Sequence, residues 1–307
     1  MEKMIQTEHL TKTYKGFNAV DHVSLSVNKG EIYGFIGLNG AGKTTTIRML
    51  LGMIRPTQGS CYINGQKVSL RNHDIWNDVG YMVETPYAYP ELTVKENLEI
   101  FRRLRMLPDP HSVNRVIDQL KLTPYTDKKA KHLSLGNAQR LGIAKALLHQ
   151  PKILILDEPV NGLDPAGIVE IRELLQDLAL NKGITLFISS HLLSEVAKVA
   201  TKIGIIHQGR LIQEVDSSRL AQLLQHRLLV DAREKSSALT TLNAAGYSFV
   251  INEDGWIETY QESAVQHPDQ IAHFLVHQGF PPTKLLVEEE NLESYFLRVI
   301  GTKGVGV

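Results

Sequence analysis

The chain has 307 residues, of which 43% are hydrophobic and 21% charged, the composition of a globular protein with a substantial core and room for more than one domain. Its 33 basic and 33 acidic side chains balance, which gives no reason to expect nucleic acid or an anionic membrane surface as a ligand. Acidic side chains are in excess over residues 216–307, which argues against a DNA-binding arm at this end.

A single cysteine, Cys61, excludes an intramolecular disulfide and fits a reducing compartment. The first residues lack the apolar core of a signal peptide, and no stretch approaches the roughly 18 apolar residues of a membrane-spanning helix. We therefore expect a cytoplasmic chain that reaches a membrane only through a partner.

The predicted elements begin with strands over about residues 3–35. Residues 23–27 alternate apolar and polar side chains, and residues 28–30 predict a turn. Ile32–Ile36 is a short apolar run typical of a buried strand. It leads into a glycine-rich loop and then into a segment compatible with a helix, residues 44–51.

This loop, G-L-N-G-A-G-K-T at residues 37–44, matches G-x-x-x-x-G-K-[ST]. Glycines let backbone N–H groups converge on a triphosphate, and the following helix adds the positive end of its dipole. Lys43 is expected to reach the β- and γ-phosphates and Thr44 to ligate Mg²⁺. A chance glycine turn is the alternative, but the strand before and the helix after are the context that the motif requires. The predicted nucleotide-binding residues are Gly37, Leu38, Asn39, Gly40, Ala41, Gly42, Lys43, Thr44 and Thr45.

Residues of about 85–150 are predicted to form a mostly helical insert. Residues 94–104 and 113–122 have helical spacing, which prolines 108, 110 and 124 interrupt. The polar run at residues 126–131 is predicted to be a surface linker.

A continuous apolar run at residues 153–156 is typical of a central parallel strand buried on both faces. Asp157 and Glu158 follow it directly. Asp157 is placed to hold Mg²⁺ through water, and Glu158 to act on an attacking water as a general base. Two acids after a strand are weak evidence alone, but with the phosphate loop they complete one metal–phosphate site.

A helix over residues 168–180 and a second buried strand at 185–188 continue a strand–helix–strand unit. His191 follows this strand, where it would be able to position the water beside a γ-phosphate, although such a histidine is usually a plain loop residue. Strands at 203–206 and 210–212 close the first domain near residue 215.

The remainder is predicted to be a small α+β domain, residues 216–307. Its expected elements are a strand at 228–230, a helix at 236–245, a hairpin around 253–255, a helix at 269–277, a strand at 284–288 and a helix at 292–300.

The segment L-S-L-G-N-A-Q-R at residues 133–140 resembles the L-S-G-G-Q-x-Q-R signature of ATP-binding-cassette (ABC) ATPases. Ser134 is a suitable helix N-cap and Gly136 leaves the approach open, although any capped helix would also account for the serine. The resemblance covers about residues 3–215. It implies a P-loop ATPase cassette of the α/β class, with a mixed sheet core, an antiparallel β part and the helical insert, to which the C-terminal domain is appended.

Further landmarks of this family recur in the expected order. The resemblance implies that Tyr14 stacks on adenine and that Glu84 stands at the position of a glutamine that senses Mg²⁺ and the transmembrane partner. It implies that Asp164 lies in a loop crossing a dimer interface, and that His191 is a switch histidine. Catalysis would then rest on Lys43, Glu158 and His191, and the metal on Thr44, Asp157 and Glu84.

The resemblance further implies two cassettes, head to tail, with two ATP molecules between them. Ser134 and Gly136 of one copy would meet the phosphate loop of the other. ATP would drive this dimerisation and so power a separate permease that spans the membrane many times, with the chain peripheral on the inner face. Residues 84–92, with Tyr87 and Tyr89, are a predicted contact with it, unless these tyrosines only cover the insert.

Three positions depart from the family pattern: Glu84 replaces glutamine, Leu135 glycine and Asn137 glutamine. These departures leave open how fast the chain hydrolyses ATP and how hydrolysis is coupled to the transmembrane partner. Together with the appended domain, they resemble the branch that serves drug, bacitracin and lantibiotic exporters.

Other functions stay open on the sequence. One is a soluble ABC ATPase in translation or DNA maintenance, although a single cassette and no heptad insertion argue against it. An importer motor and a non-catalytic regulatory cassette are others. Residues 216–307 are open to a role in dimer stability, regulation or signal reading, and the cargo is not indicated.

Overall fold

The structure of the protein, a computed structural model, describes residues 2–69, 72–84 and 86–301. The chain divides into two compact units, Met1–Ser218 and Arg219–Val307. Each unit has its own hydrophobic core. The division falls close to the predicted domain boundary at residues 215 and 216.

An antiparallel sheet of the order β2-β1-β4-β5 forms one layer of the first unit. Its long strands, β1 (Lys3–Tyr14) and β2 (Phe17–Asn28), bury apolar side chains on the face that packs inward. β4 (Gln58–Ile63) and β5 (Gln66–Lys67) were not predicted. β4 carries two glycine or serine positions and little apolar alternation, so only its pairing with β1 makes it a strand.

A six-stranded sheet of the order β10-β9-β3-β8-β7-β6 forms the second layer, and all its neighbouring strands are parallel except the edge strand β10. Every residue of β3, β7 and β8 is buried, as expected of strands covered on both faces. The mixed α/β cassette fold is thereby confirmed. The strands are β3 (Ile32–Ile36), β6 (Val79–Met82), β7 (Ile153–Asp157), β8 (Thr185–Ser190), β9 (Lys202–His207) and β10 (Arg210–Asp216).

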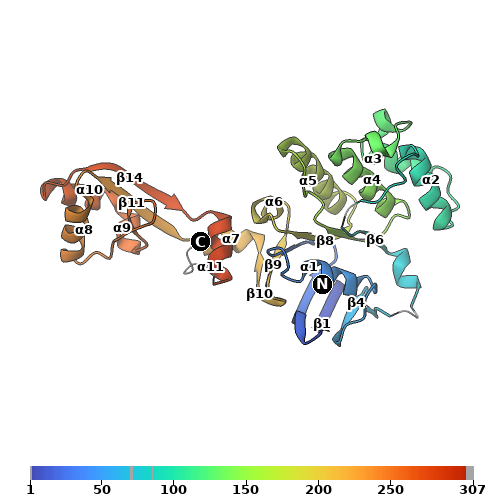
Figure 1. Ribbon diagram of the computed structural model, residues 1–307, viewed down its shortest axis with the longest axis horizontal. Helices are drawn as coiled ribbons and strands as arrows, with labels where there is room; N and C mark the ends of the chain where they lie inside the picture. Colours follow the sequence, from blue (N-terminus) through green and yellow to red (C-terminus); the bar gives the residue numbers. More distant parts are fainter. Residues whose placement is uncertain (1, 70–71, 85, 302–307) are drawn as a thin grey trace. The chain divides into compact units, whose positions relative to one another are not determined.

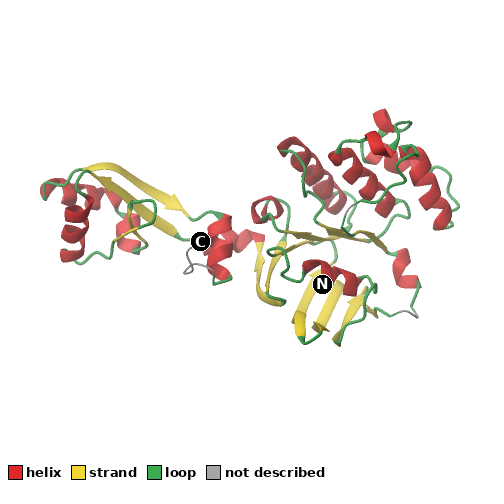
Figure 2. Cartoon of the chain, in the orientation of Figure 1, coloured by secondary structure: helices red, strands yellow, loops and turns green. Residues whose placement is uncertain are grey.

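Helix α1 (Lys43–Leu50) lies between the two sheets, and the larger helices cover the opposite face of the six-stranded sheet (Figures 1 and 2). Short 3₁₀ turns occur at Asp74–Asn77, Thr123–Tyr125 and Ala130–His132. The covering helices are α2 (Val94–Leu104), α3 (Ser112–Gln119), α4 (Leu135–Leu147), α5 (Pro165–Leu180) and α6 (Leu193–Ala197).

Helix α3 ends earlier than its apolar spacing predicted. The helix stops at Gln119, and Lys121 two residues later has a left-handed backbone with φ of 54°. The apolar residues Leu120 and Leu122 are nevertheless fully buried. The apolar periodicity therefore predicted correctly which residues are buried, although the last of them lie beyond the end of the helix.

The start of α2 organises the loop before it. Thr93 and Glu96 form a capping box, and the side chain of Asn97 is completely buried. The side-chain oxygen of Asn97 accepts a hydrogen bond from the Tyr89 N–H at 2.8 Å. Its side-chain nitrogen donates to the carbonyls of Tyr89, Leu92 and Thr93. Because a buried amide left without these partners would be costly, Asn97 fixes the segment around Tyr89 against the helix.

The second unit has the order β-α-β-β-α-β and an antiparallel sheet of the order β12-β13-β11-β14, which is the ferredoxin-like arrangement. Its core lies between this sheet and helices α8, α9 and α10. From the end of β10 onward, the elements are α7 (Ser217–Leu223), β11 (His226–Ala232), α8 (Lys235–Ala244), β12 (Val250–Ile251), β13 (Ile257–Thr259), α9 (Glu262–Gln266), α10 (Pro268–His277), β14 (Pro282–Glu289) and α11 (Leu292–Val299).

Strand β6 and helix α4 approach so closely at Gly80 that a side chain there has no room. A Cβ at Gly80 would lie 2.2 Å from the carbonyl oxygen of Ala146. We predict that Gly80→Ala lowers the free energy of unfolding of the first unit by about 1–3 kcal/mol, because the helix must shift. Urea denaturation followed by the fluorescence of Trp76, with Trp256→Phe as background, measures the change in this unit.

The matched control is Gly136→Ala. A Cβ at Gly136 would meet only Leu163 Cδ2, at 3.9 Å. This variant should be as stable as the parent or slightly more stable, since alanine favours helix over glycine. An equal urea midpoint for Gly80→Ala and the parent would contradict the steric argument.

Candidate active site

The phosphate loop joins β3 to α1, and its glycines are required by geometry at two positions. Gly40 and Gly42 have left-handed backbones, with φ of 81° and 109°. A Cβ on Gly42 would also lie 2.5 Å from the carbonyl oxygen of Ala19. Gly42 is the N-cap of α1 and supplies no capping side chain, so the first N–H groups of the helix are open to an anion.

Lys43 is buried, with 6% of its surface exposed. Its ammonium donates to the carbonyl of Gly37 at 2.6 Å and to that of Leu38 at 3.3 Å. It also lies 3.2 Å from Glu158 Oε1. The lysine is therefore held over the loop by backbone oxygens, with the Glu158 carboxylate as its counter-ion.

The carboxylate of Asp157 faces α1 from the end of β7. Thr44 Oγ1 donates to its Oδ2 at 2.8 Å, and the hydroxyl of Ser189 donates to its Oδ1. Asp157 is only 2% exposed. A threonine hydroxyl beside a buried carboxylate is an all-oxygen donor set, which fits Mg²⁺.

Glu158 stands between the lysine and a histidine. Its backbone is left-handed, with φ of 50°, a strained conformation for a residue with a Cβ. Its N–H donates to the carbonyl oxygen of Ser189 at 3.1 Å, and its Oε2 accepts the His191 N–H at 3.3 Å. His191 Nδ1 lies 2.8 Å from the same Oε2. The site thus brings together Lys43, Thr44, Asp157, Glu158 and His191, all of them predicted from the sequence.

Ser189 was not predicted, although it contacts both carboxylate residues. It is fully buried at the end of β8 and accepts the Glu158 N–H at 3.1 Å through its hydroxyl. The two serines that end this buried strand were the available signal. A buried hydroxyl needs a partner, and the neighbouring strand supplied it.

A cavity of about 870 Å³ adjoins the phosphate loop. Four loop residues, Leu38 to Ala41, line it together with Phe17, whose side chain is 65% exposed. Tyr14, the predicted adenine contact, is not among the lining residues; it is 47% exposed, and Lys12 Nζ lies 5.1 Å from its ring centre. Phe17 is therefore the aromatic side chain that borders this cavity, and the sequence analysis did not single it out.

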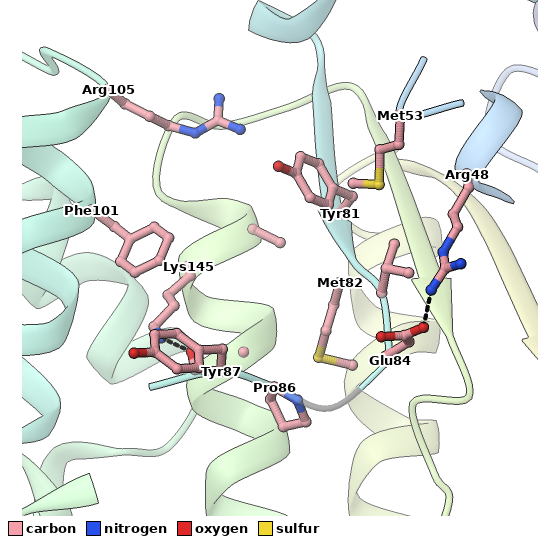
Figure 3. Close-up of a pocket in the computed structure, with 13 residues that line it drawn as sticks. Arg48, Met53, Tyr81, Met82, Glu84, Pro86, Tyr87, Phe101, Arg105 and Lys145 are labelled. Carbon is pink, nitrogen blue, oxygen red and sulfur yellow. Dashed lines mark hydrogen bonds and ion pairs between the residues drawn. The ribbon is translucent and has the colours of Figure 1, made fainter. Parts of the chain in front are cut away.

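Glu84 forms an ion pair with Arg48 of α1 (Figure 3). Its side chain is 59% exposed and its backbone is left-handed, with φ of 60°. Within the described ranges, no hydrogen bond or ion pair joins Glu84 to Thr44 or Asp157. Glu84 is thus connected to the phosphate-loop helix through Arg48, and its role toward a metal stays a prediction.

The signature segment lies against the loop that precedes α5. Ser134 caps α4, accepting the Asn137 N–H at 3.3 Å, and Asp164 caps α5, accepting the Gly167 N–H at 3.2 Å. Leu135 Cδ2 would lie 3.0 Å from a Cβ on Gly162. The structure therefore brings residues 134–136 and 162–164 together.

Among the described residues, no hydrogen bond or ion pair joins this signature segment to the phosphate-loop cluster of the same chain. A largely parallel sheet, a glycine-rich loop that leads from β3 into a helix, and two carboxylates at the end of β7, two strands away in the same sheet, define a P-loop nucleotide-binding cassette. The Lys43–Glu158–His191 arrangement adds the groups that an ATP hydrolase needs.

Comparison with known proteins gives the family. The family model described as ABC transporter matches residues 20–161. The chain is 39% identical to the bacitracin transport ATP-binding protein BcrA of Bacillus licheniformis over 308 residues, 100% of each chain. It is 35% identical to the lantibiotic transport ATP-binding protein SrtF of Streptococcus pyogenes over 233 residues, 75% of this chain and 100% of the relative.

Among solved structures, it resembles the dimeric post-hydrolysis state of the ATP-binding cassette MJ0796 bound to ADP and Pi. The TM-score is 0.64 at 25% identity, over 70% of this chain and 99% of that one. The chain belongs to the family of ABC transporter ATP-binding proteins, and its activity is the binding and hydrolysis of ATP. A soluble role in translation or DNA maintenance is not favoured by these relatives.

We predict that Ser189→Ala lowers the kcat/KM for ATP by about 10–100-fold. The variant removes a buried hydrogen bond to the Asp157 carboxylate, worth about 1.5–3 kcal/mol when the acceptor is charged. Steady-state ATPase assays across a range of Mg²⁺ concentrations measure the loss. Ser190→Ala is the matched control, because the Ser190 hydroxyl accepts the Leu192 N–H at 3.0 Å and, within the described residues, makes no hydrogen bond to Asp157 or Glu158. Equal losses in both variants would show a general effect on β8.

Proposed function

We propose that this ATPase powers an exporter of antimicrobial peptides or drugs, in resistance or immunity, by driving a separate permease. The observation that supports this is the full-length similarity to the bacitracin transport protein, which includes the second unit. Within the ranges that the structure describes, no helix is long and apolar enough to cross a membrane. The chain would then be peripheral on the inner face of the cell membrane, held there by the permease.

Within this proposal, residues 1–215 act as the ATP-binding cassette and residues 216–307 as an accessory domain. The similarity to the lantibiotic transport protein uses 75% of this chain and the whole of that relative. A cassette of this family is thus complete without about a quarter of the present chain. All residues assigned to ATP lie in the first unit.

Hydrolysis follows from the geometry around Glu158. ATP on the phosphate loop places its γ-phosphate beside Lys43, so the ammonium exchanges its contact with Glu158 for the phosphate. The released carboxylate accepts a proton from the attacking water, while His191, now 2.8 Å from Glu158 Oε2, orients the two. Thr44 and Asp157 would hold Mg²⁺, which neutralises charge developing on the β- and γ-phosphates.

A second cassette would complete the site. Ser134, Gly136 and Asp164 lie in the signature segment and in the loop against it. In the described part of the same chain, no hydrogen bond or ion pair joins these residues to Lys43. The N-terminus of α4, where Ser134 accepts the Asn137 N–H, suits the γ-phosphate of ATP bound to another copy. The structural relative in its ADP and Pi state is itself a dimer. We therefore assign a head-to-tail dimer with ATP at both interfaces.

The permease would contact the surface of residues 84–92, of which Thr85 lies outside the described residues. Tyr87 is 68% exposed and Tyr89 39% exposed, and their rings pack edge to face. Exposed aromatic side chains on a segment fixed by Asn97 are typical of a protein interface rather than of a cover for the insert.

We predict that Glu158→Gln retains ATP binding but loses at least about 100-fold in turnover, because glutamine cannot take the proton from water. Without hydrolysis the ATP-bound dimer should persist, and size-exclusion chromatography with ATP would show it. Glu170→Gln is a control on the exposed side of α5, where Glu170 pairs with Arg140. Wild-type turnover in Glu158→Gln would exclude Glu158 as the base.

The export proposal is tested by purification from the native cell. The tagged chain is expressed there, membranes are solubilised gently, and co-purifying proteins are identified. A multi-span membrane protein in comparable amount, whose loss sensitises cells to bacitracin or a lantibiotic, is the expected result. Recovery with ribosomes or nucleic acid alone would overturn the transporter assignment and leave the ATP site unaffected.

A further inference from the structure

Helix α10 of the second unit carries two histidines on its exposed face, one turn apart. His273 and His277 stand at positions i and i+4 of the segment H-F-L-V-H, and both are exposed. Their Nε2 atoms lie 3.0 Å apart, and their ring centres lie 4.3 Å apart. The two ring nitrogens therefore face each other beside the helix.

The separation of these nitrogens is close to that of two ligands of one metal ion. Zinc–imidazole bonds are about 2.0–2.1 Å long, and a tetrahedral angle between two of them separates the nitrogens by roughly 3.3–3.4 Å. The rings therefore have to part by only about 0.3–0.4 Å to admit an ion in place of the hydrogen between them. The ring that donates this hydrogen then carries its proton on Nδ1. Histidines at i and i+4 are also the spacing with which helices bind zinc.

Neither ring is engaged elsewhere. Across the described ranges, His273 and His277 have no side-chain hydrogen bond or ion pair apart from the contact between their own rings. A metal ion would therefore displace only that contact. Acidic side chains are in excess over residues 216–307, which favours a cation over an anion at this surface.

The turn that bears His277 is held in place by the end of the helix. Gly279 has φ of 85°, and its N–H donates to the carbonyl of Val276 at 3.1 Å. The N–H of Phe280 donates to the carbonyl of Leu275 at 2.9 Å. These two bonds form a Schellman motif, and Leu275 is fully buried in the core of the second unit. The imidazole of His277 thus projects from a fixed backbone, at the end of the helix whose dipole favours a cation.

Two imidazoles leave part of the coordination sphere of such an ion open. Among the residues that the structure describes, no group of three or more His, Cys, Asp and Glu side chains is placed to hold a metal. A four-coordinate ion at this pair would keep two positions for water or for a ligand from another molecule. Imidazole nitrogen suits Zn²⁺, Cu²⁺ and Ni²⁺, whereas Mg²⁺ takes oxygen ligands, so the pair differs in kind from the Mg²⁺ site beside the phosphate loop.

We propose that His273 and His277 form a binding site for a divalent transition-metal ion such as Zn²⁺, with the remaining coordination positions open to solvent or to a second molecule. The site has no part in ATP hydrolysis, because every residue assigned to ATP lies in the first unit. It gives the accessory domain a ligand of its own, and it does not depend on the exporter proposal.

The test is a titration of the metal-free full chain with ZnCl₂, measured by calorimetry with Mg²⁺ and ADP present to occupy the nucleotide site. His273→Gln and His277→Gln should each weaken the tightest Zn²⁺ binding at least about tenfold, since losing even a group behind a ligand costs about 10–100-fold. Without zinc, the melting temperature and the ATPase activity should stay at the parent values, because both side chains are exposed and glutamine suits a helix.

Two controls separate the pair from the histidine content of the chain. His267→Gln removes an exposed histidine at the N-cap of the same helix and should bind Zn²⁺ as the parent does. The double variant His277→Gln/Gln278→His keeps the number of histidines but widens their spacing by one residue. This respaced variant should lose as much affinity as His277→Gln.

The nitrogen ligands are counted by electron paramagnetic resonance with one equivalent of Cu²⁺, which imidazole also binds. Hyperfine coupling to two nitrogens is expected in the parent and to one nitrogen in either single variant. Equal Zn²⁺ affinity of the parent and both single variants would overturn the proposal, and so would full affinity in the respaced variant. An equal loss in His267→Gln would show binding by scattered surface histidines instead of by this pair.

Discussion

The contact of Lys43 with Glu158 joins the two halves of the site, and the other features of the cassette serve to place it. One partner comes from the glycine-rich loop and the other from the end of a strand more than a hundred residues later, and they meet at 3.2 Å. Parallel strands with fully buried faces bring these segments to one edge of the sheet. A buried lysine without a counter-ion would be costly, so the contact with Glu158 stabilises the loop.

Glu158 also has a strained backbone, and its contacts explain why the strain is retained at the end of β7. Glu158 has φ of 50°, and hydrogen bonds from its N–H to Ser189 hold it there. The left-handed turn aims the carboxylate at Lys43 and His191 instead of continuing the line of β7. Hydrogen bonds to the buried strand β8 offset the cost of this conformation, and strained residues at active sites persist where the surrounding structure holds them in this way.

Local patterns predicted which residues lie together at the site because these residues are contiguous or end consecutive strands. The phosphate loop, Asp157, Glu158 and His191 needed only a motif and the rule that parallel strand ends meet. Ser189 and Phe17 were missed because their importance arises from pairing across the sheet or from the wall of a cavity. Strand β6 was also missed, since Val79–Met82 is four residues long with a glycine, and its identity as a strand comes from pairing with β7.

The order β12-β13-β11-β14 leaves β14 at an edge of the sheet of the second unit. This strand spans eight residues and exposes Leu286 and Val287, which together would favour pairing with a strand of another molecule. It begins with Pro282, which has no N–H to donate, and ends in Glu288 and Glu289. Because Glu288 pairs with Arg227, the proline and the charge of Glu289 are the features that oppose such pairing. Part of the acidic excess of residues 216–307 therefore has a local use, in keeping an open sheet edge soluble at the concentrations a cell imposes.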